Sequence, residues 1–126
     1  MVAELTHFIG GKHVKGTSGR FTDAYWPMTG EIASKVPLAN AAEMRAAVEN
    51  AKAAQPGWAV TNPQRRARVL MKFLELVHKE YDQLAMLLAK EHGKTVADAK
   101  GDIQRGLEVV EFCIGAPQML KGEFTD

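Results

Sequence analysis

The sequence has 126 residues, of which 46% are hydrophobic and 25% are charged, and its formal net charge is +1. These values suit one globular domain, and they exclude a disordered or fibrous chain and a strongly basic nucleic-acid-binding protein. The longest strongly apolar run, residues 84–89, is too short to span a bilayer, and no signal-peptide pattern is present at the N-terminus. The single cysteine, Cys113, rules out an internal disulfide and fits a reducing compartment, so we expect a cytoplasmic protein. The charge and the apolar pattern lead us to expect neither membrane nor nucleic-acid partners.

Residues 1–38 are predicted to form short strands and turns. The candidate strands are residues 7–9, 12–15, 21–26 and 32–36. Gly10-Gly11 and Thr29-Gly30 are turn signals between neighbouring candidates. We therefore expect two or three of these strands to form hairpins, although the sequence alone does not specify which strands pair.

Residues 39–116 are predicted to form three or four helices. Their capping signals are Asn40 with Glu43, Asn62 before Pro63, and Thr95 with Asp98. Pro56-Gly57 is expected to end the first helix, and Gly93 is expected to cap the helix that begins at Pro63. A break at residues 78–80 would divide that helix in two. The last helix is predicted to run from Val96 to Ile114, and its Gly106 suggests the close approach of another backbone.

The sequence contains little that indicates catalysis within the chain. Cys113 lies on the apolar face of the last helix, near its C-terminus, where a thiolate is not stabilised. We therefore predict a structural role for Cys113 and assign no catalytic residue. The four histidines lack metal-ligand spacing, and no glycine-rich phosphate-binding motif occurs, so no metal-binding or cofactor-binding residue is assigned either.

Arg105 is the candidate binding residue, and it has two interpretations. Asp102 and Glu108 lie one helical turn away on either side, so a local ion pair is the interpretation that the residues alone favour. A guanidinium is also well suited to a small carboxylate, which it can grip with two parallel hydrogen bonds.

Several motifs, in order along the chain, resemble those of aldehyde dehydrogenases. They are Phe8-Ile9-Gly10-Gly11-Lys12, Trp26-Pro27-Met28-Thr29-Gly30-Glu31, the trio Trp58, Arg66 and Leu70, and Glu91-His92-Gly93-Lys94. Trp26 stands where the family usually has Asn. Residues 101–112 and 115–117 are similar to the CoA-acylating methylmalonate-semialdehyde dehydrogenases within that superfamily.

The resemblance implies an α/β fold, here the N-terminal part of an aldehyde dehydrogenase-like NAD-binding domain. Hairpins would be followed by helices, and the chain would end before the dinucleotide-binding sheet, the catalytic region and the oligomerisation region. The parent enzyme would act in valine catabolism and convert methylmalonate or malonate semialdehyde to propionyl-CoA or acetyl-CoA. Its cosubstrates NAD and CoA are not expected to bind this fragment.

In that family the arginine at the position of Arg105 helps to anchor the substrate carboxylate, so the resemblance favours the binding interpretation of Arg105. The implied partners are the remainder of the parent chain and further copies of the protein.

Two alternatives remain open. One is a fragment of another aldehyde dehydrogenase that acts on a carboxylated aldehyde, and the other is a non-catalytic helical interaction module. The continuation of the reading frame separates them, because a downstream active-site cysteine motif would support an enzyme and a stop codon at this position would support the module.

Overall fold

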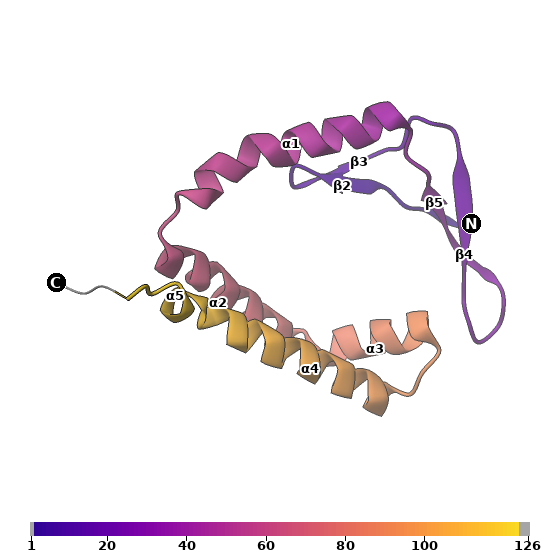
Figure 1. The fold of residues 1–126 in the computed structure, drawn as a ribbon. Coiled ribbons are helices and arrows are strands. Elements are labelled where there is room, and N and C mark those ends of the chain that lie inside the picture. The colour runs from indigo at the N-terminus through magenta and orange to yellow at the C-terminus, as the bar shows by residue number, and fades with distance from the viewer. Residues whose placement is uncertain (1, 124–126) are drawn as a thin grey trace. The chain divides into compact units, whose positions relative to one another are not determined.

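A computed structural model describes residues 2–123 of the chain. The chain divides into two compact units, Met1–Val60 and Thr61–Asp126. The first unit contains the strands and one helix, and the second unit is helical (Figure 1). The boundary between the units lies after the first helix, and the change from strands to helices, between Pro37 and Ala41, lies within the first unit.

The first unit contains two antiparallel hairpins, which together use all four candidate strands. Strands β2 (His7–Ile9) and β3 (Lys12–Val14) pair across a turn in which Gly10 and Gly11 have φ values of 60° and 74°. A residue with a side chain would be strained in this left-handed region, so the two glycines fit the tight turn. Strands β4 (Phe21–Tyr25) and β5 (Ile32–Pro37) form the second hairpin.

Strand β1 (Ala3–Glu4) was not predicted. It pairs in parallel with β5, which gives a three-stranded sheet of order β1-β5-β4. A strand of two residues carries no alternation of apolar and polar side chains. Its partner also lies 31 positions further along the chain (Ala3 opposite Ser34), so no local pattern marks it.

Helix α1 (Ala41–Ala59) begins at the predicted capping box. The side chain of Asn40 accepts a hydrogen bond from the backbone N–H of Glu43 at 2.9 Å, and a Glu43 carboxylate oxygen accepts one from the N–H of Asn40 at 2.8 Å. The other oxygen of Glu43 accepts from the N–H of Thr17 at 2.6 Å. The hydrogen bonds from Asn40 and Thr17 hold the pKa of Glu43 below its ordinary value.

The prediction that Pro56-Gly57 ends α1 is wrong. The helix continues to Ala59, and the N–H of Val60 donates to the carbonyl of Pro56 at 3.2 Å. Proline lacks the N–H that would bond four residues back, but its own carbonyl still accepts. In the last turn of a helix the loss is therefore small, and the residues after Pro56 keep their helical pairing.

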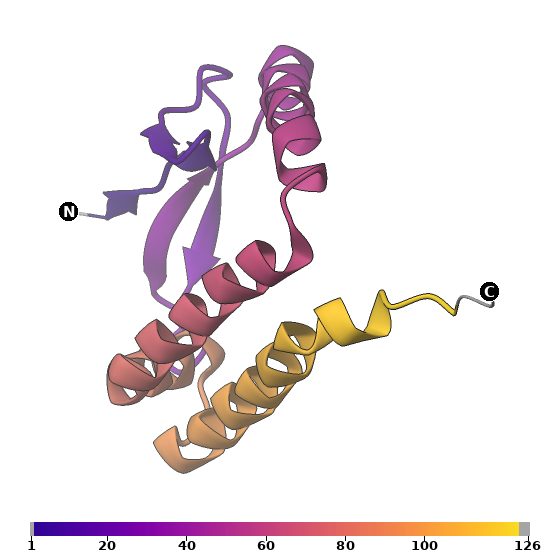
Figure 2. The same ribbon diagram turned by 90° about the vertical axis from the view of Figure 1, so that its left-hand side faces the viewer.

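The second unit consists of α2 (Pro63–Lys79), α3 (Tyr81–His92), α4 (Val96–Ile114) and the short α5 (Ala116–Met119). Helix α4 packs against both α2 and α3, and Figure 2 shows the long α2 and α4 from a second direction. The predicted break is present at Glu80, which has φ −100° and ψ 16°.

The predicted caps of the second unit are also present. The side chain of Asn62 accepts from the N–H of Gln64, and the hydroxyl of Thr95 accepts from the N–H of Asp98 at 3.2 Å. Gly93 ends α3 in the left-handed conformation at φ 75°. These local bonds fix where α2, α3 and α4 begin and end.

The contact between α3 and α4 is made by small residues. Ala85 and Ala99 are 0% exposed, and Ala89 completes their buried cluster. Leu88, Val96 and Ile103 pack around it. Alanine at these positions lets the two helix backbones approach closely.

Gly106 does not play the predicted role in the described part of the chain. A Cβ atom added there would meet no atom within 4 Å, so no described backbone approaches it. Gly106 instead opens onto a cavity of about 450 Å³. The cavity is lined by Phe73, Val77, Leu84, Leu88, Ile103, Gly106, Leu107 and Val110.

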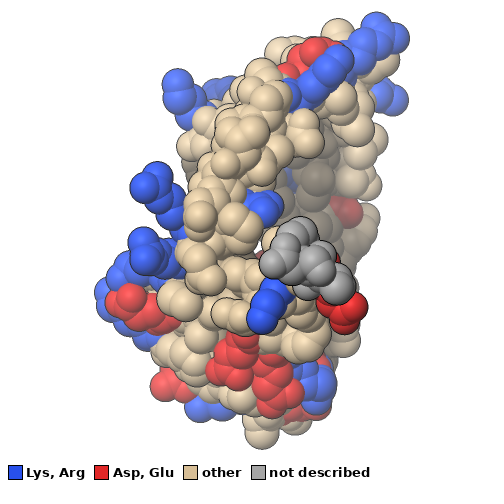
Figure 3. Space-filling model, turned by 60° about the vertical axis from the view of Figure 1, so that its left-hand side comes forward, with Lys and Arg blue, Asp and Glu red and all other residues tan. Residues whose placement is uncertain are grey.

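Charges of both signs lie on the face shown in Figure 3, with broad uncharged areas between them. Some of the large apolar side chains are strongly exposed, among them Phe112 at 69% and Val109 at 63%. No helix in residues 2–123 has the length and apolar character needed to cross a membrane.

Candidate functional site

Two of the sequence motifs meet at one carboxylate, that of Asp102. One oxygen of Asp102 accepts from the Nη2 of Arg105, which lies one turn further along α4. The other oxygen accepts from the Nζ of Lys94, which lies in the short connection between α3 and α4. We call Lys94, Asp102 and Arg105 the α4 charge cluster.

Lys94 is the most enclosed member of the cluster, with its side chain 16% exposed. Its ammonium group also pairs with Asp98 at 2.7 Å, so Lys94 joins the end of α3 to the first turns of α4. Hydrogen bonds to Asp102 and then to Asp98 raise the pKa of Lys94. The hydrogen bond from Lys94, followed by its charge and that of Arg105, lowers the pKa of Asp102. Both groups are therefore charged at neutral pH.

Arg105 is 68% exposed and makes the local ion pair that the residues alone favoured. The pair is with Asp102. Glu108 is instead within 3.4 Å of the side-chain amide of Gln104, and in the described structure it makes no ion pair with Arg105. The ion pair does not exhaust the guanidinium, which has five N–H donors.

The Nη1 side of Arg105 lies next to Gly101, a position without a side chain. A Cβ atom built on Gly101 would lie 3.7 Å from the Nη1 of Arg105. Val109 and Phe112 follow Arg105 by one and two helical turns, which places all three on one side of α4. This side of α4 thus presents a cation followed by exposed apolar surface, a combination suited to a small ligand with one carboxylate and one apolar end.

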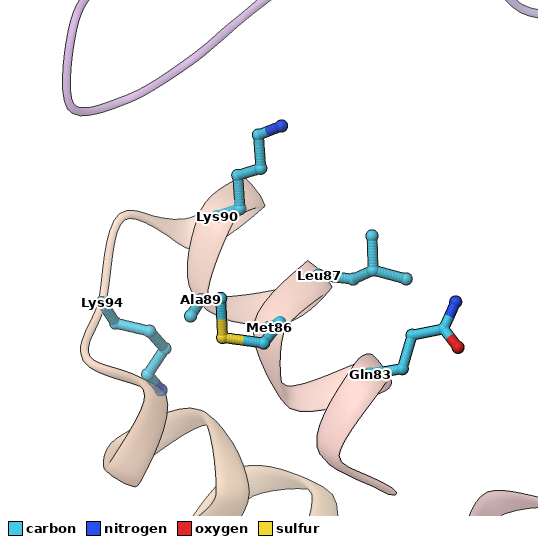
Figure 4. A pocket seen from close by; sticks show the side chains of 6 residues that line it. All are labelled: Gln83, Met86, Leu87, Ala89, Lys90 and Lys94. Atoms are coloured by element: carbon cyan, nitrogen blue, oxygen red, sulfur yellow. The ribbon is translucent and has the colours of Figure 1, made fainter. Parts of the chain in front are cut away.

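A second cavity, of about 410 Å³, lies beside α3 (Figure 4). Its lining residues are Gln83, Met86, Leu87, Ala89, Lys90 and Lys94. In this view the side chain of Lys94 ends beside α4. Since the ammonium group of Lys94 is used by Asp98 and Asp102, the cavity is an edge of the charge cluster and not a separate reactive site.

The described residues do not fit the diphosphate of a dinucleotide. The one described connection from a strand directly into a helix, residues 38–40 between β5 and α1, has the sequence Leu-Ala-Asn and contains no glycine. The N-terminus of α1 is already capped by Asn40, and the carboxylate of Glu43 adds a negative charge there that opposes a phosphate. We therefore derive no step through NAD from these residues.

The other residue types considered for catalysis or metal binding are the cysteine and the histidines. Cys113 is partly buried on α4. His13 hydrogen-bonds to Thr6 at 2.9 Å, and His7 lies 4.0 Å from Glu43. Within residues 2–123, no group of three or more His, Cys, Asp or Glu side chains is placed to hold a metal ion.

Comparison with known proteins identifies the family. The model of the aldehyde dehydrogenase family matches residues 13–126. The chain belongs to the aldehyde dehydrogenase family. Malonate-semialdehyde dehydrogenase of Pseudomonas aeruginosa is 42% identical over 121 residues, which cover 96% of the chain and 24% of that relative. The acylating mitochondrial methylmalonate-semialdehyde dehydrogenase of Arabidopsis thaliana is 45% identical over 124 residues, which cover 98% of the chain and 20% of that relative.

Solved structures confirm the predicted fold. A protein from Sinorhizobium meliloti 1021, assigned as a methylmalonate-semialdehyde dehydrogenase and complexed with NAD, is 60% identical with a TM-score of 0.93. The match covers 100% of this chain and 26% of that one. Methylmalonate-semialdehyde dehydrogenase from Oceanimonas doudoroffii is 40% identical with a TM-score of 0.90, over 98% of this chain and 25% of that one.

The chain thus spans about a quarter or less of its relatives' length and matches them as an N-terminal fragment. The resemblance to methylmalonate-semialdehyde dehydrogenases is confirmed. Neither Lys94 nor Asp98 was assigned a role beside Arg105 from the sequence. Lys94 precedes Thr95, the N-cap of α4, so the helical spacing that relates Arg105 to Asp102 does not extend to it.

Proposed function

We propose that this chain is part of an NAD-dependent, CoA-acylating enzyme that oxidises methylmalonate or malonate semialdehyde. The observation that carries the proposal is the exposed guanidinium of Arg105 in a chain similar to proteins named for these two carboxylated aldehydes. The expected products are propionyl-CoA or acetyl-CoA with release of CO2. NAD would accept the hydride and CoA the acyl group.

The contribution of this chain to the reaction is substrate binding. The guanidinium of Arg105 would grip the substrate carboxylate, because a carboxylate removed from water needs a positive partner. Val109 and Phe112 would lie along the uncharged part of the substrate, on the same side of α4. The remainder of the parent chain would supply the nucleophile and the NAD site, and further copies of the protein would complete a homo-oligomer.

Product analysis tests this function. The full-length protein is incubated with methylmalonate semialdehyde, NAD and CoA, and the products are identified by mass spectrometry. We expect propionyl-CoA in amounts that match the NADH formed. Release of methylmalonate without any requirement for CoA would contradict the acylating reaction.

A second candidate is an aldehyde dehydrogenase for a different carboxylated aldehyde. Aldehyde dehydrogenase 21 from Physcomitrella patens, in complex with its reaction product succinate, is 26% identical with a TM-score of 0.84 over 98% of this chain. A higher kcat/KM for succinate semialdehyde than for methylmalonate semialdehyde would favour this candidate. The family match argues against a free-standing helical module.

The isolated 126-residue chain is expected to have no dehydrogenase activity. Its one cysteine, Cys113, lies near the C-terminal end of α4, where the helix dipole opposes a thiolate. The measurement is NADH absorbance with methylmalonate semialdehyde, NAD and CoA, and the full-length protein serves as the positive control. NADH formation by the isolated chain would overturn this prediction.

The isolated chain is also expected to self-associate. Large apolar side chains on α2, α3 and α4 are exposed, including Phe73, Met86 and Phe112. Contiguous exposed apolar surface favours association. Light scattering should detect dimers or larger species, and Phe112→Ser should shift the distribution toward monomer. A monodisperse monomer at high concentration would count against the prediction.

A further inference from the structure

We propose that Asp102, held in place by Lys94, is a positioning residue that orients Arg105 toward the substrate carboxylate and so sets the preference for carboxylated over uncharged aldehydes. This inference rests on the proposed function, since Arg105 must meet a carboxylate for its orientation to matter. It concerns two residues that do not themselves touch the substrate.

Arg105 has a flexible side chain, and Asp102 restrains it. Its side chain is long and 68% exposed, and its one ion pair among the described residues is with Asp102. An unrestrained arginine would lose rotamer freedom each time a substrate bound. Asp102 holds the Nη2 side of the guanidinium beforehand, and such preorganisation lowers the cost of binding.

The negative charge of Asp102 also acts on the substrate. Alone, the carboxylate of Asp102 would repel an incoming carboxylate and weaken the attraction of Arg105 for it. Lys94 occupies the other oxygen of Asp102 and, at 16% exposed, is less screened by solvent than Arg105. Lys94 therefore offsets the charge of Asp102, while Asp102 keeps its geometric hold on Arg105.

The rest of the guanidinium remains accessible. Asp102 engages Nη2, and because the side chain of Arg105 is 68% exposed, donors that Asp102 does not use can be reached from solvent. A carboxylate approaching this side of α4 would meet a guanidinium that is already oriented.

The test uses the full-length protein and measures kcat and KM separately for methylmalonate semialdehyde and propanal. Asp102→Asn should raise the KM for the carboxylated aldehyde by roughly three- to tenfold with little change in kcat, and should leave propanal unaffected. In a protein that already carries Arg105→Leu, the same substitution should add less than about twofold, because Asp102 acts through Arg105. Asp102→Glu, which keeps the carboxylate, should restore most of the preference.

The matched control is Asp82→Asn. Asp82 pairs with Lys100 at 2.6 Å, so the control removes an ion pair between α3 and α4 that does not involve Arg105. Asp82→Asn should leave kcat and KM unchanged for both aldehydes. If Asp102→Asn yields no folded protein, Lys94→Gln replaces it, and it should also raise the KM for the carboxylated aldehyde, because the charge of Asp102 is then not offset.

The outcomes separate the inference from the function on which it rests. Suppose that Arg105→Leu lowers kcat/KM for methylmalonate semialdehyde more than for propanal, but Asp102→Asn does not. The proposed function then stands and the positioning role is overturned. The positioning role is also overturned if the fold losses in kcat/KM of the two single variants multiply in the double variant. Equal losses in kcat/KM for both aldehydes in Asp102→Asn overturn it as well. If neither variant affects kcat/KM for methylmalonate semialdehyde more than for propanal, the carboxylate site at Arg105 itself is overturned.

Discussion

Replacing Arg105 with Leu in the full-length protein is expected to lower kcat/KM for methylmalonate semialdehyde by roughly tenfold or more, which corresponds to about 1.4 kcal/mol of transition-state binding. Leucine removes the positive charge and the N–H donors but keeps much of the bulk. The lost interaction is with the substrate carboxylate, so steady-state kinetics with propanal should change much less.

Two comparisons sharpen this prediction. Arg105→Lys keeps the charge but lacks the planar fork of donors, so it should retain an intermediate preference for the carboxylated aldehyde. If Arg105 pairs only with Asp102, both aldehydes should respond alike and weakly, because exposed ion pairs contribute little. Equal losses for the two aldehydes, or no loss for either, would remove Arg105 from the substrate site.

Ala99→Leu is expected to destabilise the helical unit by about 2 kcal/mol, since enlarging a side chain in a packed core forces strain or backbone movement. Ala99 and Ala85 are both 0% exposed between α3 and α4. Thermal unfolding of the full-length protein, followed by circular dichroism, should show a lower Tm. Ala97→Leu is the matched control, because Ala97 is exposed on the same helix. An unchanged Tm for Ala99→Leu would show that the contact is looser than described.

The alanine contact also bears on the charge cluster. Lys94 reaches Asp102 from the connection that follows α3, so the separation of α3 and α4 sets the distance that its side chain must span. Ala99→Leu should therefore weaken the Lys94–Asp102 pair as well as the core.

Local signals predicted much of the fold. The helix starts at Asn40, Asn62 and Thr95 follow from side chains that bond to backbone N–H groups two or three residues away. Strand β1 could not be predicted in this way, because its pairing with β5 depends on residues distant in sequence. The effect of Pro56 depends on its place in the last turn of α1, and the residues around Pro56 do not specify where that helix ends.

The site was predictable only in part. The Arg105–Asp102 pair follows from their three-residue spacing on one helix. Lys94 lies before α4 begins, so its approach to Asp102 depends on the path of the connection after Gly93 and on the packing of α3 against α4. Helical periodicity does not describe that path, and for this reason the sequence predicted the pair but not the three-residue cluster.

A crystal structure of the full-length protein with methylmalonate, a carboxylated ligand that lacks the reactive aldehyde, tests the central claim most directly. We expect a ligand carboxylate within hydrogen-bonding distance of the Arg105 guanidinium, about 2.7–3.2 Å, with Asp102 still paired to Nη2. A ligand carboxylate held by other residues, with Arg105 turned away and paired only with Asp102, would contradict the claim that this arginine recognises the substrate.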